Sequence, residues 1–256
     1  MAGAGIAVVT TTALSTALLA YYLVSGRSIV RLGWAHLRWT LFADILRVGA
    51  VASITTFQTT LTVLLTTALV GAAAGPGAIA GYGTGARLEY LLVPLVFGLG
   101  APLVALVGTN IGAGQNARAL RVALTGGAFA FVLTEAVGLA AAIWPQAWLG
   151  LFGDEPTMLA AGTAYLHSVG PAYGPFGLGF ALYFASQLLW PLLAGFARLL
   201  IAVGGGWIAL ACTGSLGWVF LALSAALVTY GLLLSAAVVS GAWFKPARGG
   251  RSLQCG

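Results

Sequence analysis

Charged side chains are scarce in this sequence. They make up 6% of the 256 residues, against roughly a quarter in ordinary soluble domains. Eleven Lys and Arg and five Asp and Glu cannot cover a soluble core of this length. The composition therefore disfavours a water-soluble fold, and we expect the lipid bilayer to cover most of the surface.

Other scarcities disfavour enzymatic and cofactor chemistry. The two histidines lie far apart and form no metal-binding signature, and the glycine-rich stretch 108–114 lacks the lysine of a phosphate-binding loop. Cys212 lies near the end of an apolar run and Cys255 in the basic tail, so we expect them to face different compartments and not to pair. The net charge of +6 comes from residues in short connections between apolar runs, which indicates membrane topology rather than nucleic-acid binding. We expect no enzyme, metal or cofactor.

Long apolar runs are abundant instead. A helix needs about 20 apolar residues to cross the hydrocarbon layer, whereas barrel strands are about half as long and alternate strictly. Seven runs meet the helical requirement, which predicts an all-α integral membrane protein with about seven transmembrane helices. The runs are Ile6–Val24, Val48–Val70, Ala78–Val107, Val122–Trp144, Ala160–Ser186, Leu188–Cys212 and Leu216–Ala242.

The basic residues predict the orientation. They cluster in alternate connections, whereas the connections on the opposite side hold no Lys or Arg and include Asp154 and Glu155. Basic residues near span ends favour the cytoplasmic side, so the sequence predicts a cytoplasmic carboxy terminus and an external amino terminus. The clusters are Arg27, Arg31, Arg38 and Arg47; Arg118 and Arg121; and Lys245, Arg248 and Arg251.

The second apolar run carries an unusual number of polar side chains. At 100° per residue its hydroxyls form two arcs, with Gln58 beside the second. One interpretation is that the hydroxyls bond the carbonyl one turn back; the other is a water-facing or helix-packing surface. We take Gln58, Thr56 and Thr60 as candidate cavity residues. The arcs are Ser53, Thr56, Thr60 and Thr67, and Thr55, Thr59, Thr62 and Thr66.

Acidic residues inside spans are costly and are the natural functional candidates. Glu89 shares a helix face with Tyr82 and several small residues, and Arg87 lies on the opposite side of that helix. A carboxylate withdrawn from water is suited to carry a proton or coordinate a cation. The alternative is a structural pair with a basic group of another helix. Glu135 raises the same question.

Two proline pairs predict a bend in the fifth apolar run. Gly170-Pro171 and Gly174-Pro175 stand one turn apart, and proline removes backbone hydrogen bonds. We expect a kinked helix with Pro171 and Pro175 as a hinge. Broken helices are typical of alternating-access transporters, although prolines are common in membrane helices generally.

With these residues identified, the chain resembles the multidrug and toxic compound extrusion (MATE) transporters, most closely the prokaryotic DNA-damage-inducible subgroup. The order of the motifs carries the resemblance. They are Gly85–Glu89, Pro94–Gly100, Val107–Gly114, Val169–Gly174, Ala181–Gln187 and Leu193–Arg198.

The resemblance implies two six-helix lobes, of which this chain would be the carboxy-terminal one. Residues 1–25 would be the last helix of the other lobe, 26–47 a cytoplasmic connection, 48–244 the six-helix lobe and 245–256 a basic tail. The implied function is antiport of cationic or aromatic compounds against protons or sodium ions across the plasma (inner) membrane. Glu89 matches an acid that the family often places in this helix.

Two other functions stay open. The chain could be a transport-inactive fragment or structural partner, because the amino-terminal lobe or a second copy would be needed to complete the cavity. It could also be a lipid-linked-sugar flippase of the wider superfamily. A flippase is expected to line its cavity with several basic residues, and the spans offer only Arg87 and Arg198.

Overall fold

The computed structural model describes residues 2–25, 39–185 and 189–241. Residues 26–38 of the expected connection and the expected tail 245–256 lie outside these ranges. Every regular element in the described part is helical, and the chain divides into two compact units, Met1–Val48 and Gly49–Gly256. The all-α expectation is therefore confirmed for the described residues.

The first unit contains helix α1 (Ala2–Val24). It covers the first apolar run, and its residues Gly5–Val24 are long and apolar enough to cross a membrane. Threonine hydroxyls along it donate to carbonyls one turn back; Thr11 donates to Ala7 at 2.7 Å and Thr16 to Thr12 at 2.8 Å. These threonine hydroxyls are thus satisfied within the helix, as the hydrocarbon layer requires.

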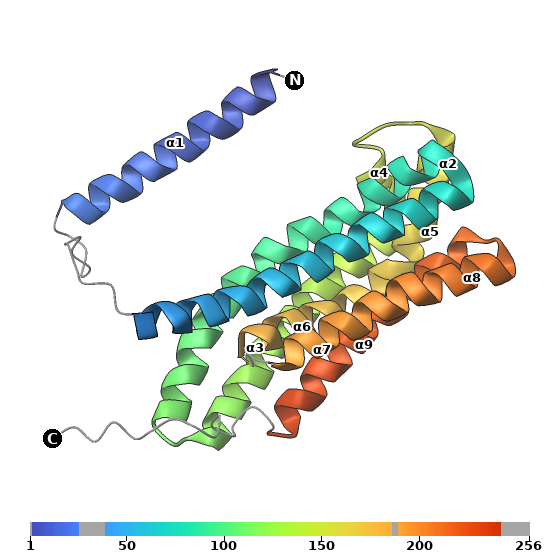
Figure 1. Ribbon diagram of the computed structural model, residues 1–256. Helices are drawn as coiled ribbons and strands as arrows, with labels where there is room; N and C mark the ends of the chain where they lie inside the picture. Colours follow the sequence, from blue (N-terminus) through green and yellow to red (C-terminus); the bar gives the residue numbers. More distant parts are fainter. Residues whose placement is uncertain (1, 26–38, 186–188, 242–256) are drawn as a thin grey trace, which may run out of the picture. The chain divides into compact units, whose positions relative to one another are not determined.

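Helix α2 (Trp39–Gly112) bends back on itself at Gly75. Gly75 has φ +77° and ψ −166°, a conformation that residues with a side chain rarely adopt, and Pro76 follows without a backbone N–H. The two arms therefore run in opposite directions, as Figure 1 shows. They correspond to the second and third apolar runs, and the turn between them matches the expected connection near residues 71–77.

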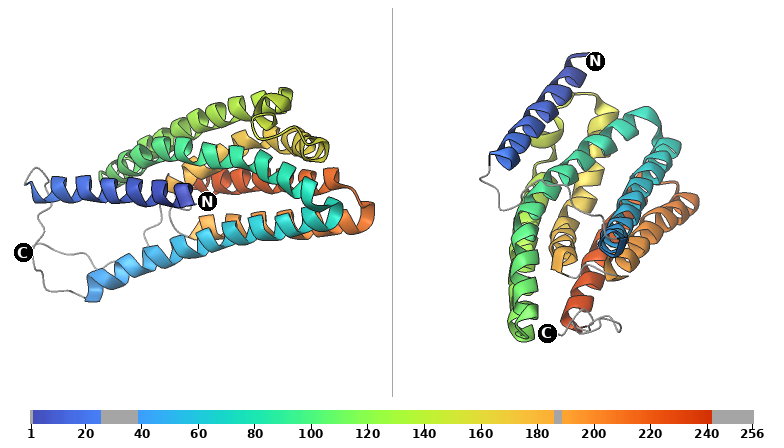
Figure 2. Two further views of the ribbon diagram at one scale, coloured as in Figure 1. Left: turned by 90° about the horizontal axis from the view of Figure 1, so that it is seen from above. Right: turned by 60° about the vertical axis from the view of Figure 1, so that its left-hand side comes forward.

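The remaining helices follow as a packed bundle (Figure 2). Helix α6 packs between α3 and α9, and α9 also contacts α5, α7 and α8. A short helix and two irregular segments interrupt the pattern. The elements are α3 (Asn116–Ile143), α4 (Pro145–Leu149), α5 (Pro156–Val169), η1 (Gly170–Ala172), α6 (Tyr173–Ala185), α7 (Leu189–Leu199), η2 (Leu200–Gly205), α8 (Gly206–Thr213) and α9 (Leu216–Val239).

All seven expected spans have a helical counterpart. Five described helices are long and apolar enough to cross a membrane, and one of them, Ala52–Gly112, has 61 residues and contains both arms of α2. The fifth expected span is the broken column α5–η1–α6. The sixth is α7, η2 and α8, with a π-helical stretch at Leu200–Gly205 that the sequence did not reveal.

Glycines let the helices of the bundle approach closely. A Cβ atom on Gly138 of α3 would overlap the carbonyl oxygen of Gly170, and one on Gly231 of α9 would overlap that of Pro175. Small residues at such contacts let neighbouring membrane helices gain van der Waals contact. The packing fixes α6 tightly between α3 and α9.

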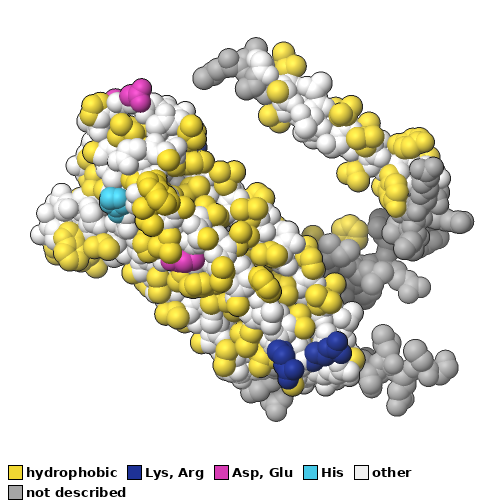
Figure 3. Space-filling view, turned by 180° about the vertical axis from the view of Figure 1, so that it is seen from behind, with side chains coloured by type: hydrophobic (Ala, Val, Ile, Leu, Met, Phe, Trp, Pro, Cys, Tyr) yellow, Lys and Arg dark blue, Asp and Glu magenta, His cyan; other side chains and the backbone are white. Residues whose placement is uncertain are grey.

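Charged side chains separate along the bundle. In the space-filling view of Figure 3, Lys and Arg side chains lie at one end of this face, whereas acidic side chains lie at the opposite end and also midway between the ends, among apolar side chains. Arg118 and Arg121 are exposed in the first turns of α3. Asp154 and Glu155 are exposed in the loop after α4, which follows the other end of α3. This separation matches the charge pattern used for orientation; the cytoplasmic side stays a prediction.

Candidate functional site

A cavity of about 440 Å³ lies inside the second unit. Both arms of α2 form part of its wall, and α5, α6, α7, η2 and α9 supply the rest. Four of the predicted site residues line it: Glu89, Gln58, Thr56 and Tyr82. Residues of the second and third apolar runs therefore meet those of the fifth, sixth and seventh runs in one place.

Aromatic rings dominate the wall. Phe97 of α2 makes an edge contact with Phe180 of α6 at 5.4 Å between ring centroids, and Phe180 stacks with Phe176 at 5.8 Å. Such rings offer flat, polarisable surfaces for an aromatic ligand. Eight of the lining residues are aromatic: Tyr82, Tyr90, Phe97, Tyr165, Phe176, Phe180, Tyr183 and Tyr230.

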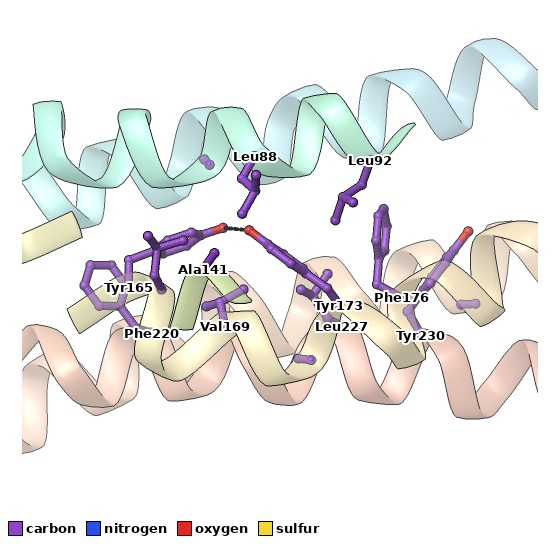
Figure 4. Packing of buried hydrophobic residues seen from close by; sticks show 14 of the residues in the cluster. Leu88, Leu92, Ala141, Tyr165, Val169, Tyr173, Phe176, Phe220, Leu227 and Tyr230 are labelled. Carbon is purple, nitrogen blue, oxygen red and sulfur yellow. Dashed lines mark hydrogen bonds between the residues drawn. The ribbon is translucent and has the colours of Figure 1, made fainter. Parts of the chain in front are cut away.

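Tyr82 belongs to a buried aromatic cluster at one side of the cavity. It is 6% exposed and packs edge-on against Tyr165 at 5.4 Å, and Tyr165 in turn packs against Phe220 at 5.5 Å. Figure 4 shows the hydroxyls of Tyr165 and Tyr173 pointing toward each other, 3.5 Å apart. The packing holds this part of the wall in one arrangement.

The acid of the cavity is paired with a base from another helix. Nη2 of Arg198 in α7 donates to Oε1 of Glu89 in α2 at 2.6 Å, and the two side chains are 15% and 21% exposed. The Arg198 guanidinium also lies over the rings of Phe176 and Tyr230, 5.2 and 5.9 Å from their centroids. Of the alternatives for Glu89, the structure contains the pair with a basic group.

Arg198 is the site residue that sequence reasoning missed. The signal was present, because Arg198 is the one charged residue in the apolar run Leu188–Cys212 and Glu89 needed a partner. The sequence did not reveal that α7 faces this arm of α2. Arg87 points elsewhere, as its helical position required, and lies 5.2 Å from the ring centroid of Phe152.

The polar arm of α2 fulfils both interpretations of its hydroxyls. Thr56 donates to the carbonyl of Ala52 at 3.0 Å and Thr59 to that of Thr55 at 3.0 Å, yet both side chains also line the cavity. The second arc contributes most, because the cavity lining includes Thr55, Thr59 and Thr62.

Gln58 is buried between α2 and α7. Its Nε2 donates to the carbonyl of Leu192 at 3.4 Å, and a Cβ on Gly195 would lie 2.6 Å from its Oε1. Within the described residues, this Oε1 has no hydrogen-bond partner. A buried carbonyl oxygen without a hydrogen-bond partner is unusual in a protein, and this one belongs to a residue of the cavity wall.

Two predicted cavity residues lie outside the lining. Thr60 is exposed and donates to the carbonyl of Thr56 at 3.0 Å, because its helical position turns it away from the wall. Glu135 on α3 instead accepts the backbone N–H of Gly174 through Oε2 at 2.7 Å. Glu135 thus contacts the start of α6 rather than the cavity.

The expected kink is present at the proline pairs. Helix α5 ends at Val169, a single 3-10 turn spans Gly170–Ala172 with Pro171 inside it, and α6 begins at Tyr173. The backbone N–H of Tyr173 donates to the carbonyl oxygen of Gly170. In a continuous α-helix this oxygen would accept the N–H of Gly174 instead. Movement about this break, with Pro171 and Pro175 as a hinge, stays a prediction.

Comparison with known families matches a model described as MatE over residues 52–208. This range contains the bend of α2, Glu89, the broken column α5–η1–α6 and Arg198.

Among the described residues, no group of three or more His, Cys, Asp or Glu side chains is placed to hold a metal ion.

Two known proteins resemble the chain over parts of their length. A protein named FAD transporter from Shewanella oneidensis is 33% identical over 111 residues, which is 43% of this chain and 24% of that protein. A solved structure described as MATE in complex with MaD5 superposes with a TM-score of 0.78 at 16% identity, covering 93% of this chain and 55% of that one. The likeness to the solved structure concerns the fold, and the chain spans about half of that protein.

Proposed function

Because the chain belongs to the MatE family of membrane transporters, we propose that it is one lobe, the carboxy-terminal one, of a secondary active antiporter. The transporter exports cationic or aromatic compounds in exchange for protons or sodium ions. One observation carries this proposal: a carboxylate, Glu89, stands in the wall of an aromatic cavity between membrane helices.

The cavity has the size and chemistry for a small organic ligand. Its volume of about 440 Å³ falls in the usual range for small-molecule sites, roughly 300–1,000 Å³. The rings supply contact area, and the hydroxyls and the amide of the first arm of α2 supply orienting groups. Within a membrane, such a polar and ionisable lining is a mark of a substrate or ion pathway.

Coupling is assigned to Glu89. A carboxylate that carries a proton or sodium ion in one state and is paired with Arg198 in the other can link ion movement to substrate movement. Alternating access moves one lobe against another around a site near their interface. The chain spans 55% of the solved MATE chain, so we expect this lobe alone to bind ligand without transporting it.

The test is gradient-driven dye movement in proteoliposomes. The 256-residue chain is reconstituted alone, and also as a chimera that carries the amino-terminal lobe of the solved MATE transporter. An imposed proton or sodium gradient should drive a fluorescent cationic dye only in the chimera, and Glu89→Gln should abolish that movement. Asp154→Asn, an exposed acid outside the cavity, serves as the matched control. Dye movement that Glu89→Gln leaves unchanged would remove the coupling role, and no movement in either protein would favour the transport-inactive alternative.

Flavin nucleotides are a second candidate substrate. The Shewanella oneidensis relative is named FAD transporter, and the cavity has both aromatic rings and the guanidinium of Arg198. Ring stacking suits the two aromatic systems of such a ligand, and a guanidinium suits its phosphates. Flavin fluorescence in the same proteoliposomes measures this directly, with Arg198→Gln as the variant expected to lose it.

The flippase alternative has less support. A flippase cavity is expected to be lined by several basic residues, whereas Arg198 is the one basic residue in the described lining. Arg87 lies against Phe152 instead.

A further inference from the structure

Two opposite charges share the wall of the cavity and neutralise each other. Glu89 is the one acid and Arg198 the one base among its described lining residues, and they are joined at 2.6 Å. All other lining residues are uncharged side chains, mostly aromatic, hydroxyl-bearing or aliphatic. The lining therefore has no net formal charge while the pair is intact.

The pair leaves hydrogen-bonding capacity unused on both sides. A guanidinium has five N–H donors, and the described hydrogen bond uses Nη2 alone. A carboxylate has two oxygens, of which the described bond uses Oε1. The rings of Phe176 and Tyr230 contact the guanidinium without consuming these donors. Ligand groups can therefore reach both charges from the cavity.

A ligand with a single charge is poorly matched to this arrangement. A cation that pairs with Glu89 meets the fixed positive charge of Arg198, and an anion that pairs with Arg198 meets the carboxylate of Glu89. Separating the two residues for either ligand leaves one charge uncompensated in a mostly buried place, which is strongly unfavourable. A ligand that carries both charges can replace the internal pair with two pairs of its own.

We infer that the cavity selects aromatic zwitterions, with the ligand's anionic group at Arg198 and its ammonium at Glu89. This inference rests on the proposed function and narrows its substrate class, from cationic or aromatic compounds to aromatic compounds that carry both charges. The ring of the ligand stacks among the aromatic side chains of α2 and α6. Its two charges satisfy the two opposed residues, so no buried charge is left alone.

Zwitterion binding also supplies a basis for exchange. A proton or sodium ion on Glu89 removes the partner of the ligand's ammonium, so ligand and coupling cation compete for one carboxylate. The ion-loaded cavity leaves Arg198 without its partner, which makes this state the less stable one and favours release of the ion. Competition for one group is what antiport requires. After release of both, Arg198 returns to Glu89 and the cavity is again neutral.

The test is equilibrium binding of matched indole compounds to the 256-residue chain in phosphatidylcholine nanodiscs at neutral pH. Tryptophan carries both charges, tryptamine the positive one, indole-3-propionate the negative one and indole-3-propionamide neither. Empty nanodiscs correct for partition into lipid. Tryptophan is expected to bind at least about tenfold tighter than any of the other three, because it gains two charge-assisted interactions together.

Variants at the pair should change the ranking in opposite directions. Arg198→Gln should make tryptamine the tightest ligand, and Glu89→Gln should make indole-3-propionate the tightest. The double variant Glu89→Gln/Arg198→Gln leaves no lone charge and should lose the preference for tryptophan. The exchange Glu89→Arg/Arg198→Glu should restore it. Arg118→Gln, outside the cavity, should leave the ranking unchanged.

Each outcome decides the inference. If the amide binds the wild-type chain as tightly as tryptophan, the ion pair is structural and the inference is wrong. If single variants fail to fold, the double variant and the exchanged pair still test the ranking. Binding with the expected ranking, but no gradient-driven movement of tryptophan or of the dye in the chimera, would keep this inference and remove the proposed function. Transport in the chimera without the expected ranking of ligands would remove this inference and keep the proposed function.

Discussion

The carboxylate of Glu135 accepts the backbone N–H of Gly174 at 2.7 Å, and so joins α3 to the first turn of α6. The N–H is available because the 3-10 turn at Gly170–Ala172 directs Gly170 O to Tyr173. A carboxylate at a helix amino terminus also interacts favourably with the helix dipole. An acid that looked like a coupling candidate therefore stabilises the start of a broken helix.

Removing this carboxylate should destabilise the bundle. We expect Glu135→Ala to lower the free energy of unfolding by about 1.5–3 kcal/mol, the usual contribution of a hydrogen bond to a charged group. Glu135→Gln keeps an acceptor oxygen and should lose less. Thermal unfolding in detergent measures both. Equal stability of all three proteins would show that the bond to Gly174 contributes nothing.

The close contact between α3 and η1 should not tolerate a methyl group. A Cβ on Gly138 would overlap Gly170 O, so Gly138→Ala should destabilise the protein by about 1–3 kcal/mol. Gly98 is also helical, and a Cβ added to it would have no neighbouring atom within 4 Å. Gly98→Ala is therefore the matched control and should be neutral or slightly stabilising. The same unfolding assay compares them, and similar losses at both positions would contradict the packing argument.

Glu155 should make stability depend on pH in the acidic range. The Thr157 hydroxyl donates to its carboxylate at 2.7 Å, as does Met158 N–H, and these bonds lower the pKa of Glu155 below its ordinary value. A lowered folded-state pKa gives stability that is present above the unfolded pKa of about 4.3 and is lost as pH falls through the folded pKa.

Melting temperature against pH, from neutral to about 3, measures this contribution. Glu155→Gln should flatten the acidic part of the profile, because the variant has no carboxyl to protonate at that position. Asp154→Asn, next to it in the same exposed loop, is the control variant. An unchanged profile in Glu155→Gln would show that capping of α5 by this residue does not affect stability.

The orientation prediction can be tested by thiol labelling. After Cys212 and Cys255 are replaced by serine, Asp154→Cys should react with an impermeant reagent added outside intact cells. Arg118→Cys, at the other end of α3, should react only after the membrane is permeabilised. The reverse pattern would place the carboxy terminus outside.

The sequence was informative about helices and bends because these depend on local chemistry. Continuous apolar runs require helices in lipid, where each backbone group must be bonded within its own segment. Gly75-Pro76 and the two proline pairs interrupt this bonding locally, so the turn of α2 and the break before α6 could be predicted. The π-helical stretch Leu200–Gly205 had no comparable local signal.

The sequence by itself predicted an all-helical membrane protein, the places where its helices bend, and the position of Glu89 inside a span. Only the tertiary structure decided which charges meet: Glu89 pairs with Arg198, 109 residues further along the chain, while Glu135 bonds Gly174. Helical periodicity gives the direction of a side chain around its own axis but not the helix that it faces. That neighbour is set by the close contacts of glycines such as Gly138 and Gly231, which pack α6 between α3 and α9.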